Sequence, residues 1–220
     1  MVHPLLHGLR VKFALDREGT ERMSAGPAII VENHLSGWDP FLTVLGTSWQ
    51  VSAVAKIELF RTPVVGWLMR VVGQIPIERG DEAQTEWVLA TARWALADGM
   101  KVGVYPEGTR GPDHDALYKL HQRVLVPLIR ESPGVPVHAV TVRYFPKGFR
   151  SRVEVRVSDP LPIDRDAMSD DEITAMVRDA MVEVSGLRYV DLPAWTAKRR
   201  AREEKARLAA EEQASGGDPA

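Results

Sequence analysis

Short apolar runs alternate with longer stretches of helical periodicity along most of this chain, and this alternation limits the folds open to it. Such a pattern is typical of βα units built around a parallel sheet. We expect strands near 28–32, 51–55, 74–78, 101–105, 136–144 and 152–158. We expect helices at 39–48, 63–72, 82–98, 116–131 and 169–185. The sequence therefore predicts an α/β fold, with a mainly parallel sheet flanked by helices in a single domain.

The chain divides into a short leading segment, a main domain and a tail. Its 220 residues, of which 45% are hydrophobic, suffice for one sizeable core, which we place at 25–192. Residues 1–24 would form a short N-terminal amphipathic segment. Lysines and arginines interleave with glutamates over 193–220, which indicates a charged, flexible helical tail. A lipid or partner contact is the alternative for this tail.

The formal net charge of −2 excludes a cationic field spread over the whole surface, so we expect no nucleic-acid partner and only local anion sites. The chain contains no cysteine. This excludes a disulfide framework, a thiolate nucleophile, a covalent thioester on the protein, and cysteine-ligated zinc or iron–sulfur clusters. The lack of cysteine also fits a reducing compartment.

No stretch of about 18 apolar residues occurs, and the N-terminus lacks the apolar core and cleavage site of a signal peptide. We therefore expect the protein to be made and kept in the cytoplasm. Residues 2–13 and 59–72 nonetheless combine apolar faces with aromatic and basic residues, a pattern that suits a lipid headgroup boundary. The alternative is that both apolar stripes face the core.

A histidine and an aspartate follow the apolar run 28–31. His34 lies in the loop after this run, and Asp39 comes five residues later, directly before Pro40. Because imidazole titrates near neutral pH, a histidine here could take a proton from a hydroxyl and return it to a leaving group. Asp39 could orient that ring and stabilise the imidazolium. Asp39 could also cap a helix that begins with Pro40, and one carboxylate can serve both roles.

Two further polar turns follow expected strands. Arg79 comes after an extended segment, where its guanidinium would bind a phosphate or pair with a neighbouring acid. The run Glu107-Gly108-Thr109-Arg110 joins a buried strand to a polar loop, and its glycine lets backbone amides approach an anion. Because ligands gather outside the carboxyl ends of parallel strands, we expect one pocket to collect these turns and the His34 loop.

Four motifs in this order resemble those of the glycerolipid acyltransferase family, which makes phosphatidic acid from lysophosphatidic acid. They are Asn33-His34…Ser36…Asp39-Pro40, Gly73…Ile77…Arg79, Glu107-Gly108-Thr109-Arg110 and Val135-Pro136-Val137. The stretch from Lys56 to Leu68 is also similar to the segment between that family's first and second motifs. The resemblance covers roughly residues 26 to 160.

The resemblance implies an enzyme that moves a fatty acyl group from acyl-CoA or acyl-ACP to the hydroxyl of a lysophospholipid, with 1-acylglycerol-3-phosphate as the expected acceptor. It implies no metal and no cofactor beyond that co-substrate. His34 would be the general base and Asp39 its orienting partner. The acceptor's phosphate and glycerol would be held by Arg79, Glu107, Gly108, Thr109, Arg110 and Lys119. The enzyme would be peripheral, at the inner face of the cell membrane.

Two departures from the family pattern bear on the acceptor site. His121 stands two positions after Lys119, where relatives often carry a small residue. Ala139 stands where the fourth motif usually closes with a second proline. These changes keep open a lipid-binding protein that has the fold without turnover.

A metal-dependent hydrolase that uses His34 and Asp39 is the other alternative. It needs a third ligand, and the later histidines, His114, His121 and His138, show no recognisable ligand spacing. Acyl transfer from a thioester needs no metal, because the thiol leaves readily and the enzyme has only to position the reactants, deprotonate the hydroxyl and stabilise an oxyanion.

Overall fold

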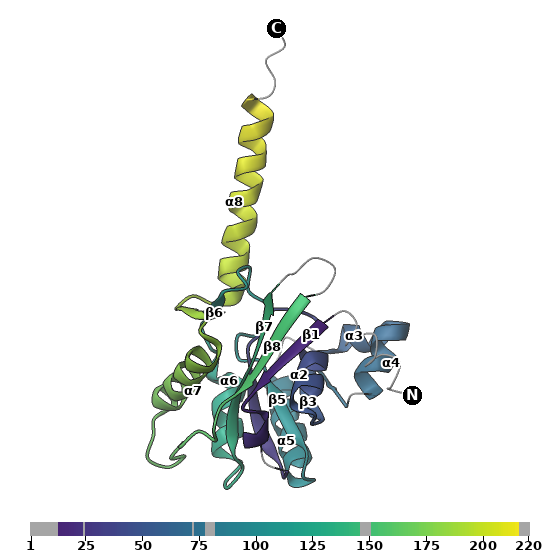
Figure 1. The fold of residues 1–220 in the computed structure, drawn as a ribbon, viewed down its shortest axis with the longest axis vertical. Coiled ribbons are helices and arrows are strands. Elements are labelled where there is room, and N and C mark those ends of the chain that lie inside the picture. Colours follow the sequence, from purple (N-terminus) through teal and green to yellow (C-terminus); the bar gives the residue numbers. More distant parts are fainter. Residues whose placement is uncertain (1–12, 24, 72, 78–81, 146–150, 216–220) are drawn as a thin grey trace.

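Seven strands form one sheet in the computed structural model, which describes residues 13–23, 25–71, 73–77, 82–145 and 151–215. The strand order is β1-β8-β7-β2-β5-β3-β4, and every neighbouring pair is parallel except β7 with β8 (Figure 1). The strands are β1 (Phe13–Glu18), β2 (Ala28–Glu32), β3 (Val51–Lys56), β4 (Ile75–Ile77), β5 (Lys101–Val104), β7 (Val137–Phe145) and β8 (Ser151–Val157). The predicted α/β fold with a mainly parallel sheet is confirmed.

Helices cover both faces of this sheet. One face packs against α2 (Asp39–Thr47), α3 (Ile57–Arg61) and α4 (Pro63–Val71), and a short 3-10 turn lies at Thr20–Arg22. The other face packs against α5 (Glu82–Ala97), α6 (Gln122–Arg130) and α7 (Asp170–Ser185). A small parallel pair, β6 (Ala116–Tyr118) and β9 (Arg188–Val190), joins the domain to α8 (Ala194–Ser215). The result is the layered arrangement that βα units build around one core.

The central strand, β2, explains where a functional site can form. All five of its residues are buried, as expected of a strand covered on both faces by helices. It runs parallel to β5 on one side and to β7 on the other. The carboxyl ends of these three strands therefore meet at one edge of the sheet, where open α/β folds bind their ligands.

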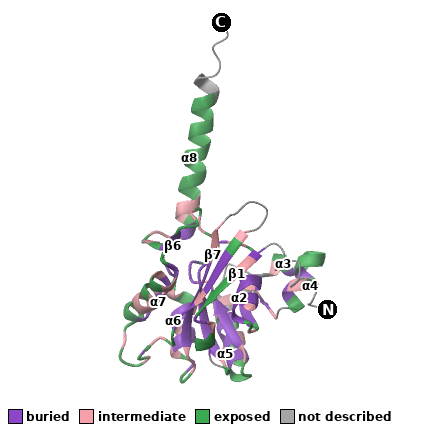
Figure 2. Cartoon of the chain, in the orientation of Figure 1, coloured by how far each residue is buried: buried purple, intermediate pink, exposed green. Residues whose placement is uncertain are grey.

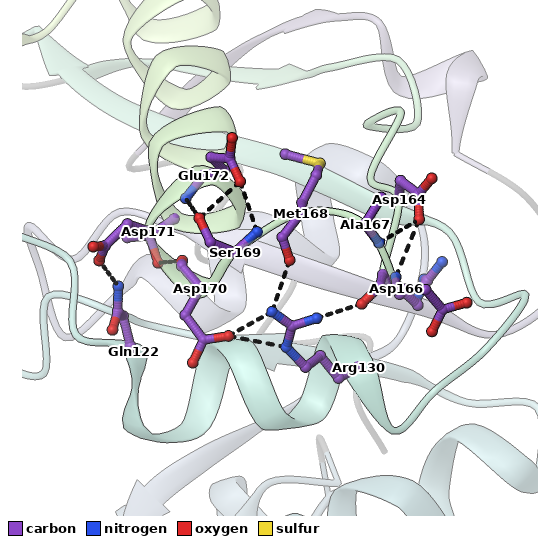
Figure 3. A network of polar contacts seen from close by, with 12 residues as sticks. Gln122, Arg130, Asp164, Asp166, Ala167, Met168, Ser169, Asp170, Asp171 and Glu172 are labelled. Atoms are coloured by element: carbon purple, nitrogen blue, oxygen red, sulfur yellow. Dashed lines mark hydrogen bonds and ion pairs between the residues drawn. The ribbon is translucent and has the colours of Figure 1, made fainter.

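Helices α6 and α7 are held together by a polar network around Arg130 (Figure 3). The Arg130 guanidinium donates to Asp170 Oδ1 from Nε at 2.9 Å and from Nη2 at 2.6 Å, and to the Met168 carbonyl. Ser169 and Glu172 form a reciprocal capping box at the start of α7. This network fixes the α7 N-terminus without using any residue of the predicted site.

Two element predictions need correction. The helix expected over 116–131 begins only at Gln122, because residues 116–118 are a buried strand paired with β9. Residues 13–18 were expected in a leading amphipathic segment, but they form edge strand β1, paired with β8, upstream of the boundary placed at residue 25. Residues 1–12 and 24 of the amphipathic segment lie outside the described residues.

The charged C-terminal segment is helical to Ser215 and projects from the domain with most of its residues exposed (Figure 2). Ion pairs at i,i+4 spacing link Arg199 with Glu203 and Arg207 with Glu211 along it. In the described part of the chain, none of the helices has both the length and the apolar character to cross a bilayer.

Candidate active site

Asn33 fixes the end of β2 against β7. Its buried side chain donates from Nδ2 to the Val142 carbonyl at 3.0 Å and accepts from the Val142 N–H at 2.8 Å. The side-chain amide of Asn33 thus takes the place of the backbone hydrogen bonds that would otherwise continue between β2 and β7. Because Asn33 directly precedes His34, this pair of hydrogen bonds sets where the histidine leaves the sheet.

His34 and Asp39 form a close pair. His34 Nδ1 lies 2.9 Å from Asp39 Oδ2, with the Asp39 side chain fully buried and 23% of the His34 side chain exposed. The same Oδ2 accepts from the backbone N–H groups of Leu35 and Ser36, each at 2.8 Å. A carboxylate can only accept, so Nδ1 carries the proton and Nε2 presents its lone pair. Among the described residues, none hydrogen-bonds Nε2.

The structure gives Asp39 a different helical position from the N-cap considered above. The N-cap of α2 is Trp38, and Asp39 is the first residue of the helix, followed by Pro40. Its carboxylate turns back to the loop amides of Leu35 and Ser36 instead of capping α2. Asp39 therefore closes the His34 loop and orients the imidazole with the same oxygen.

Glu107 braces the same loop from the next strand. It is fully buried after β5, where Oε1 accepts from the His34 N–H at 2.8 Å and Oε2 from the Tyr118 N–H at 3.0 Å. Burial raises the pKa of Glu107 to about 7, against the opposing effect of these two donors. Both oxygens are engaged by backbone amides, so Glu107 supports the His34 loop, and its expected contact with an acceptor stays a prediction.

The turn after Glu107 brings Arg110 beside the His34 loop. Gly108 has a φ of 70°, a conformation that favours glycine, and it and Arg110 are exposed while Thr109 is partly exposed. A Cβ on Gly37 would lie 3.8 Å from Arg110 Nη1, so this guanidinium borders the loop between His34 and Asp39. An anionic group near His34 would meet a cation there.

Lys119 lies in a neighbouring cavity of about 520 Å³, between the turn at β6 and the N-terminal half of α7. Its ammonium pairs with Asp191 at 3.1 Å, and that contact raises the lysine pKa. His121 lines the same cavity and lies against Gly108, since a Cβ added there would be 3.4 Å from the His121 ring. Lys119 is thus adjacent to the motif turn but already paired with a carboxylate.

Other predicted ligands are not brought to His34. Arg79 lies outside the described residues, so its expected role stays a prediction. His138 is buried within β7, where Nδ1 is 3.0 Å from the Ser158 carbonyl. Over the described ranges, no group of three or more His, Cys, Asp or Glu side chains has an arrangement that could hold a metal ion.

A buried carboxyl group lies behind the pair, and sequence reasoning missed it. Glu32, the last residue of β2, is 1% exposed and accepts from Thr43 Oγ1 at 2.6 Å and from Tyr105 Oη at 3.0 Å. Burial raises the pKa of Glu32 to about 8. The Tyr105 ring in turn packs on the His34 imidazole, with ring centroids 4.6 Å apart. The sequence signal that could have revealed Glu32 is a glutamate at the end of an otherwise apolar strand.

Tyr144 was also missed. It lies near the carboxyl end of β7, and its hydroxyl donates to Asp39 Oδ1 at 2.6 Å. The sequence could have indicated Tyr144 as the last residue of the strand expected at 136–144. This strand runs parallel to β2.

A family comparison decides what kind of protein this is. Residues 14–154 match the family model described as Acyltransferase, which is more than half of the chain. The chain belongs to the acyltransferase family. The match spans His34, Asp39, the Glu107 turn and Tyr144, so this acyltransferase-family site lies wholly within the matched region.

Relatives of this acyltransferase-family chain agree with that assignment. It is 26% identical to the 1-acyl-sn-glycerol-3-phosphate acyltransferase of Borreliella burgdorferi, over 70% of this chain and 64% of that protein. It is 31% identical to a chloroplastic 1-acyl-sn-glycerol-3-phosphate acyltransferase of Arabidopsis thaliana, over 46% of this chain and 29% of that protein. The matched segments thus span less than two thirds of either relative.

A solved structure has the same fold. The 1-acyl-sn-glycerophosphate acyltransferase PlsC of Thermotoga maritima matches with a TM-score of 0.59 and 22% identity, covering 83% of this chain and 79% of that one. At this identity the match supports the shared fold of the acyltransferase domain.

Proposed function

We propose that this acyltransferase-family protein transfers a fatty acyl group from acyl-CoA or acyl-ACP to a lysophospholipid hydroxyl, and that its acceptor is 1-acylglycerol-3-phosphate. The observation that carries the proposal is the 2.9 Å contact between partly exposed His34 and buried Asp39. The names of the relatives support this acceptor. Its product would be phosphatidic acid, which makes this a step of phospholipid biosynthesis.

The residues suggest a simple course for the reaction. His34 Nε2 removes the acceptor's hydroxyl proton while Asp39 stabilises the imidazolium. The hydroxyl oxygen attacks the thioester carbonyl carbon, a C–O bond forms, and the C–S bond breaks. The imidazolium returns its proton to the departing thiolate, giving an ester and a free thiol. No residue is acylated, in keeping with a chain that has no cysteine.

We place the acceptor's phosphate near Arg110. This exposed guanidinium borders Gly37, within the loop that joins His34 to Asp39. An arginine fork is suited to a phosphate. Exposed Gly108 and partly exposed Thr109 add polar surface there, while Arg79 and Lys119 remain proposed contacts. Glu107 would act through the His34 loop.

The first experiment follows both products. Purified protein is incubated with palmitoyl-CoA or palmitoyl-ACP and 1-acylglycerol-3-phosphate, and free thiol and lipid product are measured together. We expect stoichiometric thiol and phosphatidic acid from the wild type and none from His34→Ala. Glu204→Gln is the control, because it changes an exposed residue of α8 outside the candidate site, and it should retain transfer.

The outcomes separate the rivals. Thiol release without lipid product would mean that another acceptor is used. Lysolipid binding without transfer by the wild type would favour the binding protein, and activity abolished by a chelator would favour the metal-dependent hydrolase. Transfer by His34→Ala at the wild-type rate would refute the proposed base.

We further propose that α3 and α4 rest on the inner face of the cell membrane. Large apolar side chains are exposed on this helix pair: Leu59, Val64, Val65, Trp67 and Val71. Val64 is 76% exposed and Trp67 is 44% exposed. Arg61 and Arg70 are exposed beside them, and Arg70 lies over the Phe60 ring. Apolar and aromatic side chains beside arginines suit the headgroup boundary of anionic lipids.

A vesicle flotation assay tests this contact. Wild-type protein should float with phosphatidylethanolamine–phosphatidylglycerol vesicles, and Trp67→Glu should bind less. Trp94→Glu is the matched control, because Trp94 is 64% exposed on α5, which covers the opposite face of the sheet. Equal flotation of both variants and the wild type would refute the α3–α4 contact.

A further inference from the structure

Within the described residues, the Tyr144 hydroxyl donates a hydrogen bond to Asp39 Oδ1 at 2.6 Å. The other carboxylate oxygen, Oδ2, already serves the Leu35 and Ser36 amides and His34 Nδ1. The two oxygens of one buried carboxylate are therefore committed to different tasks. Without the tyrosine hydroxyl, Oδ1 would be buried with no donor among the described residues, and the carboxylate would no longer be held from both sides.

Tyr144 is fixed by the same pair of strands, β2 and β7, that positions His34. It lies two residues after Val142 on β7, and Val142 is the residue to which Asn33 makes its paired hydrogen bonds. The Tyr144 ring packs edge-on against buried Phe13, with centroids 6.3 Å apart. The hydroxyl therefore approaches Asp39 from a strand, and not from a loop that could adjust around the carboxylate.

We propose that Tyr144 is a positioning residue for the proposed acyl transfer: by donating to Asp39 Oδ1 it keeps Oδ2 on His34 Nδ1 and so fixes the orientation of the base. This inference rests on the proposed function. It assigns Tyr144 no contact with substrate. A carboxylate with one oxygen anchored cannot rotate away from the imidazole, and small misorientations of a base reduce catalysis strongly.

Several charged or titratable groups surround the pair. Glu32 and Tyr105 lie behind it from β2 and the segment after β5, and Glu107 holds the His34 amide. Arg110 borders the loop, and the His114 ring lies beside the Tyr144 ring, with centroids 6.5 Å apart. Within the described residues, none of these groups hydrogen-bonds the Asp39 carboxylate. Removal of the Tyr144 hydroxyl changes the hydrogen bonding of Asp39 and of the Ser36 side chain, which also contacts this hydroxyl, and leaves the other neighbours in place.

The test is Tyr144→Phe, which removes one oxygen and keeps the ring. We expect kcat for acyl transfer to fall about tenfold, the loss that accompanies one hydrogen bond to a charged group, with KM for the acceptor unchanged. The acidic limb of the kcat/KM profile should move up by roughly 0.5 to 1 pH unit, because a carboxylate with one donor fewer attracts the imidazolium more strongly.

A second readout does not depend on knowing the substrate. In protein carrying ¹⁵N-labelled histidine, the His34 signals are assigned by their absence in His34→Gln and followed through a pH titration. We expect them to titrate at higher pH in Tyr144→Phe than in the wild type. Phe13→Leu is the control for packing: it removes the edge contact with the Tyr144 ring, so it should lower the thermal midpoint and leave the His34 titration unchanged.

The two readouts keep this inference separate from the proposed function. A wild type that transfers no acyl group to any acceptor would refute the function, while the shifted His34 titration would still support the positioning role. Superimposable His34 titrations in Tyr144→Phe and wild type would overturn the positioning role, even if the variant were less stable. A change confined to KM would overturn it as well, because it would indicate direct substrate binding.

Discussion

Replacing Glu32 by glutamine should change how the stability of the fold depends on pH. Glu32 is 1% exposed, and burial raises its pKa from 4.5 to about 8. Over this window the folded protein holds a proton that the unfolded chain has released. Stability is then present in full at low pH and is lost as the pH rises toward 8. Glutamine cannot ionise, but its carbonyl oxygen can still accept from Thr43 and Tyr105.

The expected magnitude follows from linkage. Each pH unit inside the window lowers the free energy of unfolding by about 1.4 kcal/mol for one such group. Between about pH 5 and about pH 7.5, the wild type should therefore lose about 3 kcal/mol relative to Glu32→Gln. Glu107, whose pKa burial raises to about 7, adds a slope of the same sign that both proteins share. The difference between the two curves isolates Glu32.

Urea titrations at a series of pH values would measure this difference, with fluorescence of the six tryptophans as the probe. Glu204→Gln on exposed α8 is the matched control and should run parallel to the wild type. Parallel curves for Glu32→Gln and wild type across the whole range would refute the argument, because they would mean that Glu32 binds protons alike in both states. A changed m-value would instead indicate altered compactness.

Three other substitutions give distinct expectations. Asn33→Leu leaves the Val142 N–H and carbonyl without their side-chain partner, and should lower the unfolding free energy by about 3 kcal/mol in urea titrations; a loss below ~1 kcal/mol would contradict the bracing role. Glu107→Gln turns an amide NH₂ toward a backbone N–H, so thiol release should fall at least about tenfold while Glu204→Gln remains active. Gly66→Ala places a Cβ 2.1 Å from the Phe60 carbonyl oxygen, which forces α3 and α4 apart; the thermal midpoint should fall by about 5 °C or more, and an unchanged midpoint would show that the corner can adjust.

The sequence predicts the fold well where a single pattern dominates. The apolar run of β2 and the alternation of strands with helices predict the mainly parallel sheet, because a strand that is buried on both faces is typical of a parallel sheet covered by helices. The edge strand β1 was missed because it is half exposed and pairs only with β8, far away in the sequence. Residues 116–118 were assigned to a helix for the same reason: their strand partner, β9, lies about seventy residues further on.

The candidate site was predictable in part. The spacing of His34 and Asp39 places an imidazole and a carboxylate on one loop, which is a local relation that sequence can show. Tyr144 reaches Asp39 from a strand 105 residues later, so only the sheet order reveals the contact. The family resemblance implied that Glu107 contacts the acceptor, and that contact stays a prediction. The burial of Glu107 against two backbone amides is a property of the folded loop.

The two strands that position His34, β2 and β7, also contain buried polar atoms without hydrogen-bond partners. Within the described residues, the buried side-chain atoms without a hydrogen-bond partner are Glu32 Oε1, His138 Nε2 and Thr141 Oγ1, and all three lie on β2 or β7. Each such atom is destabilising, because burial removes its water without a replacement. A fold shaped by stability alone would have apolar side chains there. These atoms fall on the two strands that hold His34 and Tyr144, as is expected where a sheet gives up some stability to support a functional site.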